Sequence, residues 1–200
     1  MSDAPKRPRR PAGPPPNAAR LREAALAHLA RFAATEAGLR RVLERRIARW
    51  ARAAEAEGQA REAIAASTAA LNTEIATIAK SLVAAGAVND AAFAESRARR
   101  LARSGHSRRA IAAHLAAKGI ETETAAAVLP DGEEAELLAA LAFCRRRRLG
   151  PFARVAPDAP ARMKALAALA RGGFAQGITR RALAMDPAEA EDRLLTGRQS

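Results

Sequence analysis

The chain has 200 residues, of which 34 are Lys or Arg and 21 are Asp or Glu, so its net charge is +13 at pH 7. Alanine supplies most of the apolar residues and only 3% of residues are aromatic, which excludes a β-sandwich or barrel and predicts a thin core of closely packed helices. A single cysteine, Cys144, excludes an internal disulfide, and no apolar run approaches the roughly 20 residues that cross a bilayer. We therefore expect a cytoplasmic protein with a polyanionic partner and no membrane contact.

The first 17 residues are rich in Pro, Arg and Gly and contain almost nothing to bury. Residues 1–17 are therefore predicted to form a disordered basic tail.

Helical spacing of apolar residues begins at Ala18, and Thr35 is a candidate N-cap for the second helix. The stretch 51–70 is predicted to continue that helix, with Gly58 as a candidate break.

Short helices separated by tight loops are predicted for the rest of the chain. The reason is that Ser, Thr and Asn, which favour helix N-caps, alternate with glycines, which favour helix C-termini. Asn72 or Thr73 is expected to begin a helix that ends at Gly86. Later helices follow Asn89, Ser107 and Thr122, and three more lie between 133 and 184. The polar residues 185–200 are expected to be a frayed C-terminal segment.

An internal repeat supports this organisation. The spacing Leu115-(x)3-Gly119-(x)9-Leu129 recurs as Leu169-(x)3-Gly173-(x)9-Leu183. Each unit is a helix, a turn that stops at Gly, and a second helix. Stacked helical units build elongated, curved surfaces, so the predicted fold class is all-α.

No constellation of catalytic residues is found. The histidines His28, His106 and His114 are not at metal-ligand spacing, and no phosphate-binding Gly-rich loop is present. Cys144 has no obvious His partner; the four arginines that follow it would favour a lowered thiol pKa, but a buried structural thiol is the preferred interpretation. We expect no enzymatic activity, no cofactor and no metal.

Basic clusters form the candidate binding surface. Base stacking is not expected, because the few aromatic residues resemble core residues. The free N–H groups of a helix that begins after Ser107 favour an anion, which makes Ser107–Arg109 a candidate phosphate position; the alternative is a solvated basic face. The candidate residues are Arg40, Arg41, Arg45 and Arg49; Arg97, Arg99, Arg100, Arg103, Arg108 and Arg109; and Arg145, Arg146, Arg147 and Arg148.

Four blocks in order resemble the RecX family of regulatory proteins. Residues 39–43 (LRRVL) resemble its N-terminal L-R-R-x-L block, and 82–94 (LVAAGAVNDAAFA) its G-(Y/L)-(L/I)-(D/N)-D-x-x-F/Y-A signature. Residues 105–120 resemble the second part of that signature, and 171–174 (RGGF) the C-terminal R-R-G-F block. Ala87 and Gly172 depart from the family pattern, and Arg52–Asn72 is longer than in compact members, as in an elongated subtype.

The resemblance implies tandem three-helix repeats, which we place at 18–70, 73–129 and 133–184 within a domain of residues 18–184. It also implies a non-enzymatic regulator of recombination, DNA repair and the SOS response. Such a protein binds the RecA recombinase filament on DNA and inhibits its ATPase, co-protease and strand-exchange activities. We expect a monomer that can also contact the DNA phosphate backbone.

A second interpretation is a transcription factor of the helix-turn-helix type. Residues 93–103 and 107–118 would form the motif, with the second helix reading bases. That helix is rich in alanine and offers few side chains for base contacts.

Overall fold

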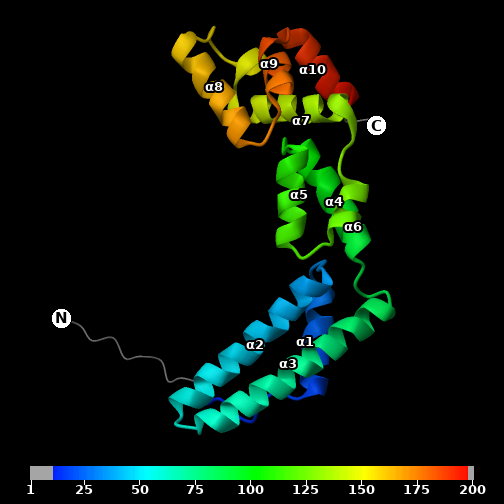
Figure 1. The fold of residues 1–200 in the computed structure, drawn as a ribbon, viewed down its shortest axis with the longest axis vertical. Coiled ribbons are helices and arrows are strands. Elements are labelled where there is room, and N and C mark those ends of the chain that lie inside the picture. The colour runs from blue at the N-terminus through cyan, green and yellow to red at the C-terminus, as the bar shows by residue number, and fades with distance from the viewer. Residues whose placement is uncertain (1–10, 198–200) are drawn as a thin grey trace, which may run out of the picture. The chain divides into compact units, whose positions relative to one another are not determined.

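The computed structural model describes residues 11–197, and all regular elements in that range are helical (Figure 1), which confirms the all-α class. The chain divides into two compact units between Asn89 and Asp90. The first unit contains α1 (Ala18–Leu29), α2 (Glu36–Ala56) and α3 (Arg61–Ala84). The second contains α4 (Asp90–Arg103), α5 (Arg108–Ala117), α6 (Thr122–Val128), α7 (Gly132–Arg147), the 3-10 turn η1 (Gly150–Phe152), α8 (Ala159–Arg171), α9 (Gln176–Ala184) and α10 (Pro187–Thr196).

The first unit is a long hairpin of α2 and α3, against which α1 packs (Figure 1). Thr35 caps α2 as predicted, because its hydroxyl accepts the Gly38 amide hydrogen at 2.9 Å. Gly58 separates the two long helices with φ +80, a conformation that favours glycine. The core of this unit consists of Leu21, Ala25, Leu39, Leu43, Ile47, Leu71, Ile75, Ile78, Leu82 and Val88.

The predicted start of a helix at Asn72 or Thr73 is wrong. Asn72 and Thr73 lie in the middle of α3, where the Thr73 hydroxyl donates to the Ala69 carbonyl of the preceding turn. No glycine or proline interrupts the chain between Arg61 and Gly86, so the helix continues through these residues. The first repeat therefore extends to Ala84, and the second begins at Asp90.

Residues 11–17, the described part of the predicted tail, are placed against the first unit. The buried indole of Trp50 donates from Nε1 to the Gly13 carbonyl at 3.2 Å, and the Ala12 amide donates to the Glu57 carboxylate. A buried indole N–H needs an acceptor, and here the chain before α1 provides it. Residues 1–10 of the predicted tail lie outside the described residues.

The second unit has two apolar clusters. The first joins α4, α5 and α6 through Ala94, Ala98, Leu101, Ile111, Leu115, Ile120 and Ala125. The second surrounds α7, and its larger members are Leu137, Leu141, Phe143, Leu169, Phe174, Ile178 and Leu194. Many of the buried residues are alanines, so neighbouring helices approach closely, as the composition predicts.

The repeated Leu-(x)3-Gly spacing marks one way of ending a helix. In both copies the residue after Gly donates its amide back to the Leu carbonyl, from Ile120 to Leu115 at 3.1 Å and from Phe174 to Leu169 at 3.2 Å. This bond is typical of the Schellman motif, which needs a left-handed residue at the glycine position. Gly119 and Gly173 meet that need with φ +83 and +87.

The C-terminal segment differs from the predicted frayed end. Asp186 caps α10 by accepting the amide hydrogens of Ala188 and Glu189, and Pro187 opens the helix. Ala190 and Leu194, one turn apart, are buried with the α7 cluster. This apolar pair and the Asp-Pro start are enough to form a short packed helix. Residues 198–200 lie outside the described range.

Candidate functional site

Six of the candidate arginines lie in α4 and α5, and three of them form hydrogen bonds or ion pairs within the protein. Arg97 donates from Nε to His114 Nε2 at 2.9 Å, and Arg99 pairs with Glu95 at 2.8 Å. Arg108 donates to the Pro130 carbonyl and pairs with Asp131 at 3.0 Å. Carboxylates therefore partly neutralise Arg99 and Arg108, whereas Arg97 keeps its charge and is held in place by the bond to His114.

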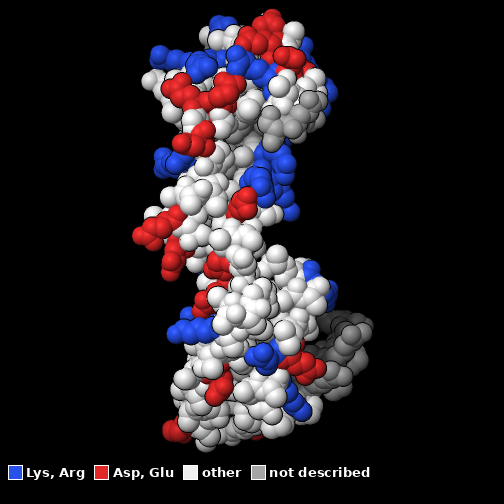
Figure 2. All heavy atoms as spheres, turned by 90° about the vertical axis from the view of Figure 1, so that its right-hand side faces the viewer, with Lys and Arg blue, Asp and Glu red and all other residues white. Residues whose placement is uncertain are grey.

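The other three, Arg100, Arg103 and Arg109, are exposed. None of them has a hydrogen-bond or ion-pair partner among residues 11–197. Figure 2 shows Figure 1 turned about its vertical axis, so each helix keeps its vertical level. At the level of α4, Lys and Arg side chains gather on the face that Figure 2 shows. We call Arg100, Arg103 and Arg109 the free arginine set; it is the part of the predicted middle cluster that remains available to a partner.

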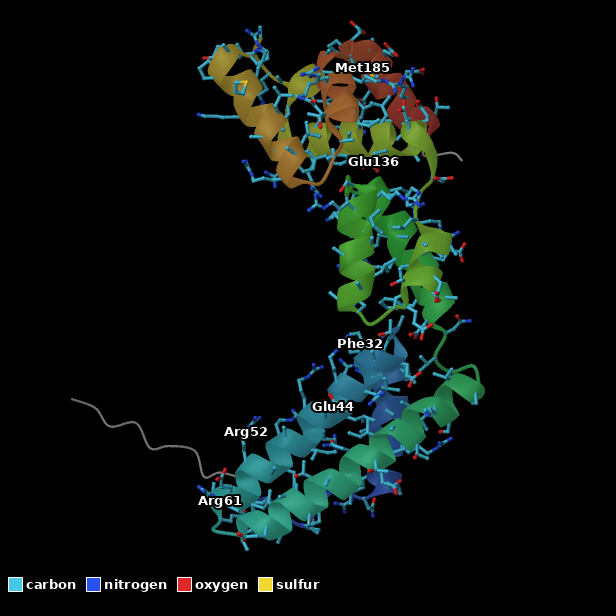
Figure 3. All side chains as sticks on the ribbon, viewed as in Figure 1. Phe32, Glu44, Arg52, Arg61, Glu136 and Met185 are labelled. Carbon is cyan, nitrogen blue, oxygen red and sulfur yellow. The ribbon has the colours of Figure 1, made fainter. Side chains whose placement is uncertain are left out.

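The predicted phosphate position at Ser107–Arg109 is occupied by the protein's own Glu136. The Ser107 hydroxyl, fully buried, accepts the Ala110 amide hydrogen at 3.1 Å and donates to the Gly172 carbonyl at 2.6 Å. The Arg108 amide donates to a Glu136 carboxylate oxygen at 2.9 Å. Figure 3 shows Glu136 on the side of α7 toward α5. The expectation of a bound phosphate is therefore wrong, because a carboxylate already satisfies the start of α5.

The end of α4 is held against α7 in the same region. A Cβ added at Gly105 would lie 2.4 Å from the Phe143 backbone nitrogen, so only glycine fits this approach. Arg146 donates to the Ser104 carbonyl at 2.7 Å across the same contact. The helices α4 and α5 are thus fixed to the last repeat by backbone proximity and by polar bonds.

The four arginines at the end of α7 do not act as a single free cluster. Arg145 pairs with Glu191 at 3.6 Å, and the guanidinium groups of Arg146 and Arg147 lie over the Phe143 ring at 5.7 and 4.9 Å. Arg148 ends the helix in the left-handed conformation with φ 56. Arg148 is exposed and has no partner within the described range.

The arginines of α2 belong to the first unit. Arg40, Arg41, Arg45 and Arg49 are all exposed. Beside them, a groove of about 370 Å³ is lined by residues that include Arg46, Arg49 and Phe32.

Phe32 is a candidate binding residue that sequence reasoning missed. In the sequence it continues the helical spacing of Leu21, Ala25 and Leu29, which predicts a buried position, but it is 52% exposed in the turn after α1 (Figure 3). The His28 ring lies 5.3 Å from its ring, and the Arg31 guanidinium 5.2 Å. The expectation that aromatic residues are core residues is wrong here, because α1 ends at Leu29, before the spacing reaches Phe32.

Cys144 is a structural thiol. Its side chain is fully buried, and burial raises its pKa to about 12, so the alternative of a pKa lowered by the following arginines is wrong. We expect the native protein to react with a thiol reagent such as dithionitrobenzoate only as fast as it unfolds. One equivalent should react at once in denaturant; equally rapid reaction of the native protein would contradict this.

His114 should make stability sensitive to pH. Burial, assisted by Arg97 and Lys118, lowers its pKa below the ordinary 6.5, and the bond from Arg97 Nε requires a neutral acceptor at Nε2. As pH falls below 6.5, the unfolded chain therefore binds more protons than the folded one, and this contribution to stability is lost. Urea unfolding should show a lower free energy at pH 5.5 than at pH 7.5. The difference should shrink in His114→Gln and persist in His28→Gln.

The remaining structural observations concern metals and membranes. Between residues 11 and 197, no group of three or more His, Cys, Asp or Glu side chains is placed to hold a metal ion. No helix in that range combines the length and apolar character needed to span a bilayer.

The geometry also bears on the helix-turn-helix alternative. A reading helix presents its N-terminal residues to the bases. At the start of α5, Ser107 is buried and the Arg108 backbone amide donates to Glu136. Gly173 approaches so closely that a Cβ there would lie 2.7 Å from the Ser107 hydroxyl. The start of α5 is therefore covered by the last repeat, which disfavours base reading.

Comparison with known proteins identifies the family. Residues 89–129 match a family model described as RecX, second three-helix domain. The regulatory protein RecX of Myxococcus xanthus is 38% identical over 172 residues, which cover 84% of this chain and 86% of that protein. The chain belongs to the RecX family. The regulatory protein RecX of Agrobacterium fabrum is 44% identical over 108 residues, 54% of this chain, and the match spans only 58% of that protein.

The family match agrees with the structural boundaries. The RecX second three-helix domain covers α4, α5 and α6, and it begins at Asn89, where the two compact units divide. In this RecX family member, the free arginine set lies on that domain. The family resemblance of the sequence is thereby confirmed.

Proposed function

We propose that this RecX family member binds a RecA recombinase filament on DNA and inhibits its ATPase, co-protease and strand-exchange activities without catalysing a reaction itself. Membership of a family of regulatory proteins is the observation that carries the proposal. The free arginine set supports it, since exposed guanidinium groups without internal carboxylates suit DNA phosphates or an acidic protein face.

Electrostatic binding gives the proposal a recognisable salt dependence. Each DNA phosphate that an arginine neutralises releases counterions, so affinity falls steeply as salt rises. A protein–protein contact between opposite charges also weakens, because the screening length is about 10 Å at 0.1 M salt. Inhibition should therefore require more protein at 200 mM than at 50 mM salt.

The deciding experiment is the DNA-dependent ATPase of RecA, measured with and without this protein. The proposal expects the rate to fall with increasing protein concentration. The same titration with preformed filaments, followed by fluorescence anisotropy of labelled single-stranded DNA, reports binding directly. An unchanged ATPase at saturating filament binding would contradict inhibition, and specific binding to one duplex sequence without RecA would support the transcription-factor alternative.

A further inference from the structure

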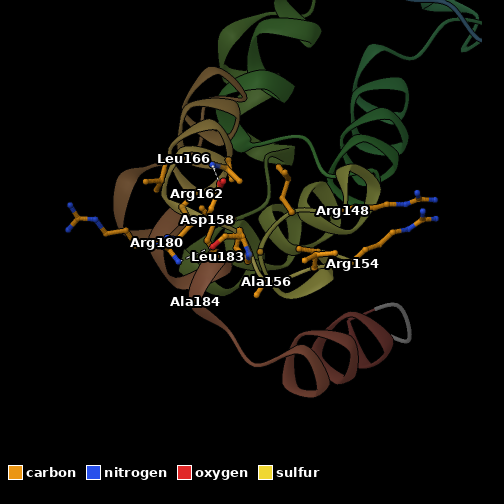
Figure 4. A pocket seen from close by; sticks show the side chains of 16 residues that line it. Arg148, Arg154, Ala156, Asp158, Arg162, Leu166, Arg180, Leu183 and Ala184 are labelled. Carbon is orange, nitrogen blue, oxygen red and sulfur yellow. Dashed lines mark hydrogen bonds between the residues drawn. The ribbon is translucent and has the colours of Figure 1, made fainter.

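A groove in the last repeat is not used by the proposed function. It has a volume of about 770 Å³ and lies between α8, α9 and the segment from Arg148 to Asp158 (Figure 4). Apolar side chains line it on several sides: Leu149, Ala165, Leu166 and Leu183. A groove of this size accommodates a few amino-acid side chains or a small molecule.

Arginines surround this apolar lining. Arg148, Arg154, Arg162 and Arg180 all contribute to the groove. In Figure 4, Arg148 and Arg154 extend side by side in one direction, and Arg180 extends in the opposite direction. Positive charge is thus present on two sides of the groove.

These charges are not balanced within the groove. Its one acidic residue, Asp158, caps α8 by accepting the Ala161 amide hydrogen at 2.8 Å. Arg162 donates to the Pro157 carbonyl at 3.0 Å, and this neutral acceptor does not balance the arginine charge. Arg148, Arg154 and Arg180 have no partner in the described part of the chain.

A large apolar side chain also lies unprotected in the lining of the groove. Val155 is 79% exposed, which makes it the most exposed of the large hydrophobic residues in the described range. It continues the apolar lining to the surface, next to charges that are not balanced, and this combination favours a partner that is both apolar and acidic.

We propose that this groove binds an acidic peptide segment of a protein partner. Large apolar side chains of the segment occupy the lining formed by Leu149, Leu166 and Leu183, and its carboxylates pair with Arg154 and Arg180. Paired guanidinium–carboxylate bonds are among the stronger polar contacts in proteins. Single-stranded nucleic acid fits less well, since no aromatic side chain lines the groove for a base to stack on.

The test uses a fluorescein-labelled peptide of about 12 residues in which glutamates alternate with leucines, followed by fluorescence polarisation with the full chain. Saturable binding is expected. The double variant Arg154→Glu, Arg180→Glu should weaken it at least tenfold, because attraction becomes repulsion at both sides. Both side chains are exposed, so the variant should keep the circular dichroism spectrum of the unchanged protein.

Two controls separate the groove from general electrostatics. The variant Arg45→Glu, Arg49→Glu carries the same charge change in the first unit and should bind the peptide normally. A peptide with serine in place of leucine should bind at least tenfold more weakly. Val155→Asp provides an independent variant, since it places a carboxylate beside the lining without removing a buried group, and it should also weaken binding.

Several results would overturn the proposal. These are no saturable binding, an equal loss in the control variant, or undiminished binding of the serine peptide. Tighter binding of an oligothymidine, lost in Arg154→Glu, Arg180→Glu, would assign the groove to nucleic acid instead. The proposal does not depend on RecA inhibition, which the ATPase measurement decides separately.

Discussion

Changing Arg100 and Arg103 together to glutamate should abolish inhibition of the RecA ATPase at protein concentrations at which the unchanged protein inhibits fully. Both side chains are exposed and have no partner within residues 11–197. Each charge-assisted contact contributes about 1.5–3 kcal/mol, and the new carboxylates add repulsion. Filament affinity should therefore fall by roughly 100-fold or more. The measurement is an ATPase titration beside fluorescence anisotropy on preformed filaments.

The choice of these two arginines follows from the contacts of their neighbours. Reversing Arg108 would place a carboxylate beside Asp131 and remove the bond to the Pro130 carbonyl, so an effect on binding would be mixed with a local structural change. A matched control is Lys80→Glu with Lys164→Glu, which produces the same change in net charge at two other exposed positions. If that control loses inhibition equally, net charge rather than the α4 surface is responsible. If the arginine variant is folded and still inhibits, the binding surface lies elsewhere, as on α2 or at Arg148.

Gly105→Ala should destabilise the second unit by more than about 3 kcal/mol. The new Cβ would meet the Phe143 nitrogen at 2.4 Å and its Cα at 2.7 Å, and both atoms belong to the backbone of α7 and cannot rotate away. The residue also has φ +80, which adds about 1–2 kcal/mol for a residue with a side chain. Urea unfolding followed by circular dichroism gives the free energy.

Gly86→Ala is the matched control for this experiment. Gly86 has a similar φ of +70, but a Cβ there would meet nothing within 4 Å. Its substitution should show the backbone effect alone, about 1–2 kcal/mol. Equal losses in the two variants would mean that α4 and α7 do not approach as closely as described.

Local signals were enough to predict much of this fold. Thr35 and Ser107 cap helices as expected, because a hydroxyl before a run of helix formers is a strong start signal. The Leu-(x)3-Gly repeat identified helix ends correctly. The helix start predicted at Asn72 or Thr73 is wrong. A capping residue inside a continuous run of helix formers looks the same in the sequence as one at the beginning of a helix.

Long-range contacts account for the errors in the site. Glu136 accepts the Arg108 amide hydrogen although it lies 28 residues away in the sequence, and no residue near Ser107 predicts this bond. Arg97 and Arg108 have partners 17 and 23 residues away, so in the sequence they looked equivalent to Arg100 and Arg103. The partner of Arg99 is different, because Glu95 lies one helical turn before it and is a local signal that the sequence reasoning overlooked. Charge clusters in sequence locate a basic region, but only the packing of helices decides which of its side chains remain free.

The bond between Glu136 and the Arg108 amide determines which piece of the chain can be exchanged between relatives. Consider a chimaera that receives only α4, α5 and α6 from another family member. The recipient's α7 would then have to supply a carboxylate at the position of Glu136, and its backbone would have to accept the close approach of the Gly105 turn. The transferable module is therefore the whole of residues 90–197, in which both sides of this contact travel together.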